Sequence, residues 1–429
     1  MSAADGKTAA AAPSAAPSAA PSTARALDGV RVLDLSRILA GPWCAQNLAD
    51  LGAEVIKVER PRVGDDTRSW GPPWLPDGEG NPSGDATYYA GANRGKRSLT
   101  LDIASAEGQA IVRELAARSH IVLENYKVGD LKRYGLDFDS LKAINPALVY
   151  CSITGYGQQG PSAHKPGYDF IFQGLGGLMS ITGERDDLPG GGPQKVGVAV
   201  VDIFTGMYAT VAVLGALRHA ERTGEGQHLD IALLDAAVAV GATPIIGQRI
   251  TGKVPGRFGN AHANMVPYHV FATADGYMIV AAGNDGQWQA YCRGVDRPDL
   301  AADERFRSGP GRLVNRDALV PLLEAHMRTQ PTAFWVEALE REGIPCGPIN
   351  DYAQVLEDPQ VRHRELQVDL TRSDGGLCPT VKSPLRLSAT PVRYDAPPPR
   401  LGEHTEAVLS GVLGKSPEEI AALRERGVI

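Results

Sequence analysis

The chain has 429 residues, of which 43% are hydrophobic and 22% charged, and its formal net charge is −7. This composition allows a sizeable buried core and gives no general reason to expect nucleic acid or an anionic membrane surface as a partner. Five cysteines without a Cys-x-x-Cys pair argue against a disulfide framework or a zinc site and favour a cytoplasmic location. No apolar run approaches the length expected of a membrane span.

Residues 1–25 contain the near four-residue repeat AAPSAAPSAAPS and few large apolar side chains. Such a segment cannot bury enough surface to offset its ordering entropy, and its prolines oppose a helix. Neither a secretory signal nor an arginine-rich transit peptide fits it well. We therefore expect a disordered tail.

From residue 27 the pattern alternates between β-branched apolar runs and amphipathic stretches. The runs predict strands and the stretches between them predict helices, which is the arrangement of βαβ units. Such units build a parallel sheet with helices on both faces, so we expect a large Rossmann-like α/β domain over residues 27–225. Strands are expected at 30–35, 54–59, 98–103, 120–124 and 148–153, and helices at 43–51, 107–118 and, in two pieces, 130–144.

A Gly-x-Gly-x-x-Gly motif follows the strand expected at 148–153 and spans residues 155–160. A dinucleotide fingerprint must open a helix whose N-terminus binds the pyrophosphate. Here Pro161 and Pro166 flank a polar segment without helical periodicity. We therefore expect a loop at this place and no nicotinamide or flavin site.

The stretch 195–236 carries the strongest candidate for chemistry. An apolar run at 196–201 predicts a short buried strand, and apolar residues at helical spacing from Gly206 to Gly224 predict a helix. Asp202 lies between the two elements. It is either the N-cap of the helix, the commonest role of aspartate at such a junction, or a nucleophile. The two roles are compatible, because free N–H groups and the positive helix end would keep the carboxylate ionised.

Beyond this helix the pattern changes. We expect a linker at 226–253, a smaller inserted α+β domain at 254–349, and a return segment at 350–429 that completes the large domain. In the inserted domain an Asp-Gly pair at 275–276 separates two apolar runs and predicts a hairpin, because Asp-Gly favours tight turns. Helices are expected at 312–327, at 332–342 and after Ser416, and short strands around 382–387.

Several stretches of the chain carry a family resemblance: LDGVRVLDLSRILAGP (27–42), DLGAEVIKVERPRVGDDTRSWGPP (50–73), NRGKRSLTLD (93–102), ENYKVGDLKRYGLD (124–137), ITGYGQQGP (153–161), the Asp202 stretch and LGEHT (401–405). Together they resemble the family III CoA-transferases, to which α-methylacyl-CoA racemase is related. The resemblance runs from residue 27 to the C-terminus. The residues in these motifs are most similar to those of the succinate–hydroxymethylglutarate CoA-transferase subfamily.

The resemblance implies an activity and a mechanism. The family's catalytic aspartate falls on Asp202, whose carboxylate would attack an acyl-CoA to give an aspartyl anhydride and then an aspartyl-CoA thioester. The resemblance further implies acyl-CoA and a free carboxylic acid as substrates, no permanently bound cofactor, no metal, and an interlocked homodimer. The subfamily resemblance implies succinyl-CoA as donor and a dicarboxylate such as glutarate or hydroxymethylglutarate as acceptor.

The matching positions also imply contacts with the substrates. CoA would lie on the first βαβ units, at strand ends where open α/β sheets bind ligands, with arginines for its phosphates. A loop that shields the anhydride from water matches Gly259, Asn260 and His262, and it lacks the polyglycine run of the formyl-CoA enzymes. Asn260 or His262 is expected to meet the distal carboxylate of the acid. The implied CoA-binding residues are Ile38, Leu39, Ala40, Arg60, Asn125, Tyr126 and Arg133.

Tyr168 stands where the racemase relatives use a histidine for proton transfer. Because tyrosine is a poor base near neutrality, this difference favours a transferase. The nearby His164 keeps an acyl-CoA racemase open as an alternative, and a non-catalytic acyl-CoA binding protein is another. A free acceptor acid discriminates among the three, because only a transferase moves CoA to it.

Overall fold

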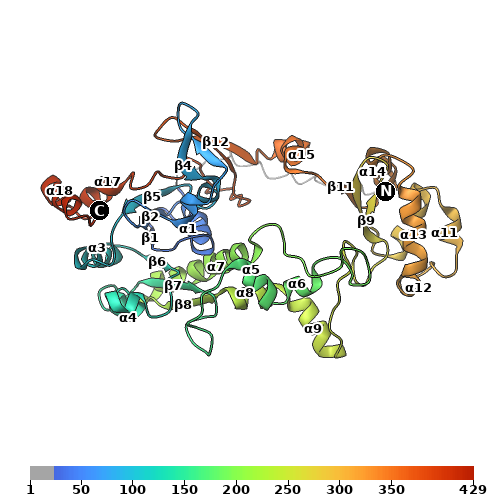
Figure 1. Cartoon of the computed structure of the whole chain (residues 1–429), viewed down its shortest axis with the longest axis horizontal. Helices are drawn as coiled ribbons and strands as arrows, with labels where there is room; N and C mark the ends of the chain where they lie inside the picture. Colours follow the sequence, from blue (N-terminus) through green and yellow to red (C-terminus); the bar gives the residue numbers. More distant parts are fainter. Residues whose placement is uncertain (1–23) are drawn as a thin grey trace, which may run out of the picture.

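The computed structural model describes residues 24–429, so the tail expected at 1–25 lies almost entirely outside the described residues. The chain is elongated, with a sheet-bearing region at one end and a smaller region at the other (Figure 1). Two segments join these regions and run apart from each other. One follows α9 (Ala242–Thr251), and the other contains α15 (Tyr352–Glu357).

Six parallel strands form the main sheet in the order β5-β2-β1-β6-β7-β8. The five strands expected from the apolar runs are present. The sixth comes from the segment expected as a linker at 226–253, so that expectation is wrong for β8, whose His228 pairs with Tyr150 of β7. The strands are β1 (Arg31–Asp34), β2 (Glu54–Glu59), β5 (Lys96–Thr100), β6 (Ile121–Glu124), β7 (Val149–Thr154) and β8 (His228–Ala232).

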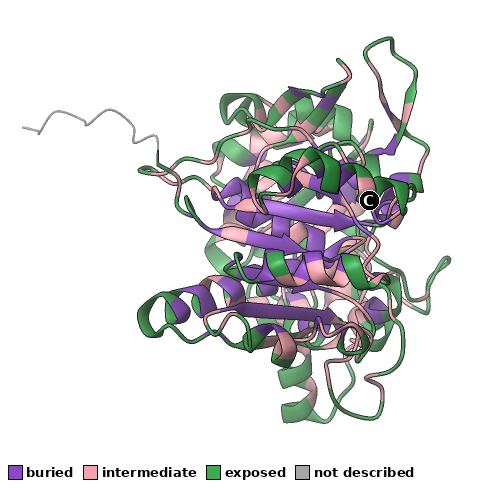
Figure 2. Cartoon of the chain, turned by 90° about the vertical axis from the view of Figure 1, so that its left-hand side faces the viewer, coloured by how far each residue is buried: buried purple, intermediate pink, exposed green. Residues whose placement is uncertain are grey.

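Helices cover both faces of the main sheet, whose strands are mostly buried (Figure 2). The α/β class expected from the alternation is therefore confirmed. One face carries α1 (Ala40–Asp50), α5 (Asp169–Leu175), α7 (Val200–Thr223) and α8 (Leu233–Val240). The other carries α3 (Ala106–Ala116), η2 (Leu131–Tyr134), α4 (Phe138–Lys142), α17 (Thr405–Gly411) and α18 (Pro417–Glu425).

The strand expected at 196–201 is wrong. This segment is irregular, and α7 begins at Val200. One reason is that β8 already occupies the sheet edge beside β7. Another is that the Gln173 side-chain oxygen accepts the N–H of Val196 at 2.8 Å, which holds the segment against α5. The helix itself is confirmed and ends at Gly224, whose φ of +74° suits glycine.

Helix α7 also corrects the expectation that no run approaches a membrane span. By its 24 residues and its mean hydropathy of 1.8 it could cross a membrane, and α8 with α9 passes the same test only as a pair bent by 66°. Half of the apolar window of α7 is buried inside the protein. There it packs closely on α1, because a Cβ on Gly206 would lie 2.6 Å from the Ala40 carbonyl oxygen. We therefore describe α7 as a core helix of the sheet region.

The smaller region contains a three-stranded antiparallel sheet of order β11-β10-β9, which confirms the predicted hairpin. Helices cover one face of this sheet and bury Phe271 and Trp288. The single helix expected at 312–327 is broken at Asn315 into two. The elements are β9 (Tyr268–Ala272), β10 (Tyr277–Ala281), α10 (Asp285–Gly294), α11 (Pro298–Ala302), α12 (Gly309–Val314), α13 (Arg316–Met327), α14 (Thr332–Arg341) and β11 (Cys346–Pro348).

The remaining elements are short. The strands expected around 382–387 are wrong, because the hairpin lies earlier, in β12 and β13, and Pro384 has no N–H to give to a ladder. These elements are η1 (Asp66–Ser69), β3 (Trp74–Pro76), β4 (Pro82–Ala86), α2 (Thr87–Ala90), α6 (Leu178–Ile181), α16 (Pro359–His363), β12 (Gln367–Thr371) and β13 (Leu377–Val381).

Candidate active site

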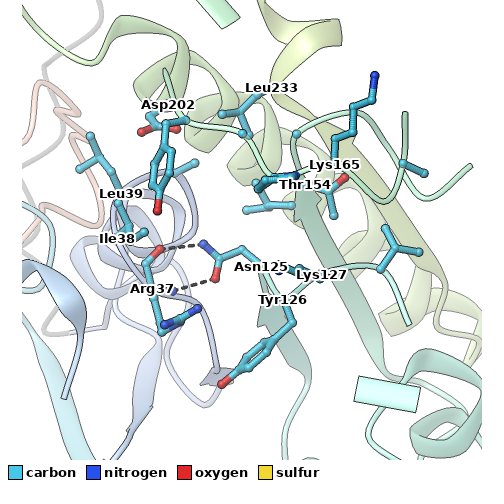
Figure 3. A pocket seen from close by; sticks show the side chains of 18 of the residues that line it. Arg37, Ile38, Leu39, Asn125, Tyr126, Lys127, Thr154, Lys165, Asp202 and Leu233 are labelled. Carbon is cyan, nitrogen blue, oxygen red and sulfur yellow. Dashed lines mark hydrogen bonds between the residues drawn. The ribbon is translucent and has the colours of Figure 1, made fainter. Parts of the chain in front are cut away.

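A cavity of about 180 Å³ lies at the carboxyl ends of β1, β6 and β7, and Asp202 forms part of its wall (Figure 3). The carboxyl ends of parallel strands are where open α/β sheets bind ligands. Six residues that the sequence predicted for the site line the same cavity as Asp202: Ile38, Leu39, Ala40, Asn125, Tyr126 and Tyr168. The tertiary structure thus brings together residues that are up to 164 positions apart, as between Ile38 and Asp202.

The loop after β1 is held by an amide clamp. The Asn125 side chain accepts the N–H of Arg37 at 2.9 Å and donates to the Arg37 carbonyl oxygen at 2.7 Å (Figure 3). Ile38 then adopts φ +71°, in the left-handed region that costs a β-branched residue strain energy. Its N–H donates to the Asp65 carboxylate at 3.2 Å. These bonds fix the cavity wall nearest to α1.

Buried ion pairs support this loop from below. Lys57 pairs with Asp65 at 2.9 Å and donates to the Ser36 carbonyl oxygen, and none of the Lys57 or Asp65 side chain is exposed. Burial alone would raise the pKa of Asp65, but the Lys57 ammonium and hydrogen bonds from Thr67 lower it to about 2. The carboxylate therefore stays ionised and keeps accepting the Ile38 N–H.

Asp202 lies in the first turn of α7, yet it does not cap the helix. Ala199 occupies the N-cap position and makes no side-chain bond to the helix. The N–H groups of Val201 and Asp202 instead donate to the Asp169 carboxylate, at 2.7 and 3.2 Å. The N-cap interpretation of Asp202 is therefore wrong, because Asp169 performs that role from the start of α5.

The electrostatics of Asp202 also differ from the expectation. Burial, and secondly the charge of Asp169, raise the pKa of Asp202 from its ordinary 3.8 to about 7. The N–H groups that were expected to keep it ionised donate to the Asp169 carboxylate instead, and Asp169 adds a repelling charge. The carboxylate is therefore divided between its ionised and neutral forms near neutral pH.

Five of the predicted site residues do not line the Asp202 cavity. Arg60 pairs with Asp66 at 3.1 Å and lines a smaller neighbouring cavity that also includes Tyr126. Arg133 is exposed and pairs with Asp130 at 2.7 Å. The other three, Gly259, Asn260 and His262, lie in the loop before β9, where the Gly259 N–H donates to the Gly183 carbonyl oxygen. Roles for these five residues remain predictions.

Sequence reasoning missed several functional candidates. Arg37, Lys127 and Lys165 line the cavity and could receive phosphate or carboxylate groups. Lys127 directly follows Asn125 and Tyr126 in the loop after β6. Its position beyond the end of a strand could therefore have identified it as a site residue. Asp169 follows Tyr168 in the chain, and nothing in the sequence indicated that it would reach α7. In the described part of the chain no group of three or more His, Cys, Asp or Glu is placed to hold a metal ion.

A parallel sheet whose strand ends surround a cavity with a helix-borne carboxylate is a ligand-binding site of the open α/β class. The sequence profile of CoA-transferase family III matches residues 27–405. The chain belongs to this family, which confirms the resemblance seen in the sequence. It is a family III CoA-transferase and, as in that family, acts on acyl-CoA.

Two curated relatives are similar over most of their length. Succinate–glutarate CoA-transferase of Agrobacterium fabrum is 48% identical over 384 residues, which cover 90% of this chain and 95% of the relative. Succinyl-CoA:glutarate CoA-transferase of Mus musculus is 42% identical over 407 residues, covering 94% of this chain and 90% of the relative. Both belong to the same activity class as the function expected from the sequence.

Solved structures support the same fold. The crystal structure of a CAIB/BAIF family protein from Brucella suis has a TM-score of 0.81 and 45% sequence identity, and the match covers 90% of this chain and 99% of that one. A crystal structure of Rv3272 from M. tuberculosis has a TM-score of 0.77 at 31% identity, with the same coverage. The α/β arrangement described above is therefore shared with experimental structures.

Proposed function

We propose that this enzyme moves CoA from succinyl-CoA to glutarate or a related dicarboxylate such as hydroxymethylglutarate, with Asp202 as nucleophile. The observation that carries the proposal is the place of Asp202: a partly buried carboxylate on α7 that shares one cavity with the strand-end loops of β1, β6 and β7. The substrates are taken from the names of the relatives. One name gives succinate and glutarate, and the other gives succinyl-CoA and glutarate.

The chemistry divides one exchange between two carboxylic acids into steps of similar energy. An Asp202 oxygen bonds to the thioester carbonyl carbon, and the C–S bond breaks to give an aspartyl anhydride and CoA thiolate. The thiolate attacks the Asp202 carbonyl carbon, so that succinate leaves and an aspartyl-CoA thioester remains. The acceptor carboxylate repeats the two steps in reverse, which returns the Asp202 carboxylate without net proton uptake.

The ionised form of Asp202 begins this sequence, so the raised pKa sets a pH requirement. With a pKa of about 7 the nucleophilic fraction rises as the pH passes through neutrality. A bound substrate that excludes water protects the anhydride from hydrolysis. Arg37, Lys127 and Lys165 are the cations of the cavity that can pair with CoA phosphates or with the distal carboxylate of the acid.

A double test separates this function from the alternatives. Wild type incubated with succinyl-CoA alone should carry a hydroxylamine-sensitive adduct on the peptide with Asp202, and should form glutaryl-CoA when glutarate is added. Asp202→Asn should do neither, because an amide cannot form the anhydride. Asp317→Asn, an exposed aspartate in the first turn of α13, is the matched control and should behave as wild type.

The alternatives give different products. A racemase would exchange the α-hydrogen of a 2-methylacyl-CoA with solvent deuterium and would ignore glutarate, a reaction for which His164 lies in the same cavity. A binding protein would retain acyl-CoA unchanged. Glutaryl-CoA formation by Asp202→Asn at the wild-type rate would refute the nucleophile assignment.

We further propose that two copies of the chain form an interlocked homodimer. Large apolar side chains are exposed on α7, where Val211 is 64% and Tyr208 47% exposed, and on the open face of β10, where Tyr277 is 61% exposed. Exposure of two such apolar faces to water is unfavourable for a monomer, whereas a second copy of the chain could cover both. Two separate segments connect the regions (Figure 1), so each chain has the ring-like path that interlocking requires.

The dimer is tested by sedimentation over a wide range of concentrations. Interlocked chains should remain dimeric on dilution, because separation requires large opening of the fold. Val211→Asp should impair assembly, whereas the same change at the exposed Val314 on α12 should not. Monomers of wild type at low concentration would contradict interlocking.

For the location we propose a reducing, cytoplasmic compartment. All five cysteines are free thiols, and all but Cys346 are buried. Intracellular reduction keeps thiols in this state. Fractionation of source cells tests the proposal, and recovery from an oxidising compartment would contradict it.

A further inference from the structure

The carboxylate of Asp169 is hydrogen-bonded to the first turn of α7, which carries the proposed nucleophile. Asp169, 8% exposed, directs Oδ1 at the N–H groups of Val201 and Asp202, which lie 32 and 33 residues later in the chain. The first N–H groups of a helix have no partner within the helix. A side chain that accepts two of them fixes where the helix starts and therefore where its first side chains point.

The other oxygen of this carboxylate is also engaged. Gln173, one turn further along α5, donates from Nε2 to Asp169 Oδ2 at 2.6 Å. Its Oε1 accepts the N–H of Val196 at 2.8 Å. Gln173 is 1% exposed, so water does not compete for these hydrogen bonds. The pair thus holds both the first turn of α7 and the irregular segment that leads into it.

We propose that Asp169, oriented by Gln173, is a positioning residue that sets the direction and the reactivity of the Asp202 carboxylate. The inference rests on the proposed role of Asp202 as nucleophile. Asp169 acts in two ways: its hydrogen bonds fix the backbone of the nucleophile, and its negative charge disfavours a second negative charge beside it. A nucleophile held in this way is less stabilised as a free carboxylate and more inclined to form a bond.

The other groups near Asp202 do not replace this charge. Tyr88 on α2 is close enough that Asp202 and Asp169, after burial, raise its pKa. The remaining charged or titratable side chains of the cavity wall are Arg37, Tyr126, Lys127, His164, Lys165 and Tyr168. Among all of these, burial and the Asp169 charge are what raise the pKa of Asp202. Removal of the charge alone should therefore be visible in the pH dependence.

Two substitutions separate the hydrogen bonds from the charge. Asp169→Asn keeps an oxygen for the helix N–H groups, since asparagine caps as well as aspartate. It should move the acidic limb of the pH profile of kcat/KM downward by about one pH unit, because Asp202 ionises more easily. Asp169→Ala removes the cap and should lower kcat about 100-fold, the scale expected of a misplacement of about 1 Å, with little change in the KM for acyl-CoA.

A double variant controls for a hydrogen-bond conflict. In Asp169→Asn the new amide group faces the amide of Gln173, donor against donor. Asp169→Asn combined with Gln173→Glu restores an acceptor and moves the charge away from Asp202. It should fold at least as well as Asp169→Asn and keep part of the downward pH shift. Asp358→Asn is the matched control, because Asp358 caps α16 by accepting two N–H groups outside the cavity.

The outcomes are distinct. Unchanged acidic limbs in Asp169→Asn and wild-type kcat in Asp169→Ala would overturn the proposal, as would a loss of melting temperature in Asp169→Ala without loss of kcat. If wild type transfers no CoA and forms no adduct, the proposed function fails instead. A shifted limb with the melting temperature retained in Asp169→Asn supports the positioning role.

Discussion

Asp202→Asn should make the folded protein more stable above neutral pH while it abolishes transfer. In the folded chain the pKa of Asp202 is raised from 3.8 to about 7, by burial and by Asp169. An ionised Asp202 is therefore disfavoured in the folded state relative to the unfolded state. A neutral amide of the same shape removes this cost and leaves the cap of α7, which Asp169 provides, in place.

The size and the pH window of the effect follow from the two pKa values. At about 1.4 kcal/mol per pKa unit, the rise corresponds to at most roughly 4 kcal/mol, and screening by nearby solvent reduces it to about 1–3 kcal/mol. Below about pH 4 both states are protonated and the difference from wild type vanishes. The stability difference between Asp202→Asn and wild type grows as the pH rises from 3.8 to about 7, and it is complete above about pH 7.

The assay is thermal unfolding of both proteins at pH 5, 6, 7 and 8 in one buffer series. Asp202→Asn should melt a few degrees above wild type at pH 8, and the gap should narrow toward pH 5. Asp317→Asn, at an exposed position on α13, should not be more stable than wild type at pH 8. A variant less stable than wild type at pH 8 would refute the reasoning, because it would show that the carboxylate makes a stabilising contact.

Three further substitutions test the surroundings of the site. Lys96→Met leaves the Asp34 carboxylate buried without its partner at 3.0 Å, so unfolding free energy should fall by about 3–5 kcal/mol in chemical denaturation. Asn125→Ala removes both hydrogen bonds to the Arg37 backbone and should raise the KM for acyl-CoA at least tenfold, with the fold intact by circular dichroism; an unchanged KM would show that the clamp is dispensable. Gly206→Val places a Cβ 2.6 Å from a carbonyl oxygen at the start of α1, so it should lower both kcat and melting temperature, whereas the same change at Gly215, where nothing lies within 4 Å, should not clash with a neighbour.

The sequence was most informative where structure depends on local pattern. The β-branched residues Val55, Ile56 and Val58 predicted β2, and the apolar run at 121–123 predicted β6, because strands buried on both faces are rich in such residues. The helix expected after Ser416 is present as α18, and its start depends on a capping box between Ser416 and Glu419, which lie only three positions apart. Asp202 was identified by its position near a helix start and by the family motif. The structure places it in the cavity wall, and its role as nucleophile stays a prediction.

Tertiary structure decided what depends on which segments meet. The run at 196–201 is as apolar as a strand, but β8 holds the sheet edge and the run leads into α7 instead. The same physics assigned the cap of that helix to Asp169 and not to Asp202. The free N–H groups of a helix N-terminus can donate to any carboxylate that lies close enough. The packing of α5 against α7 decides which carboxylate that is. The sequence by itself therefore determined most of the elements and the candidate nucleophile. The hydrogen-bond partner of the Asp202 N–H and the raised pKa of the Asp202 carboxylate arise only from distant residues brought into contact, which no local pattern encodes.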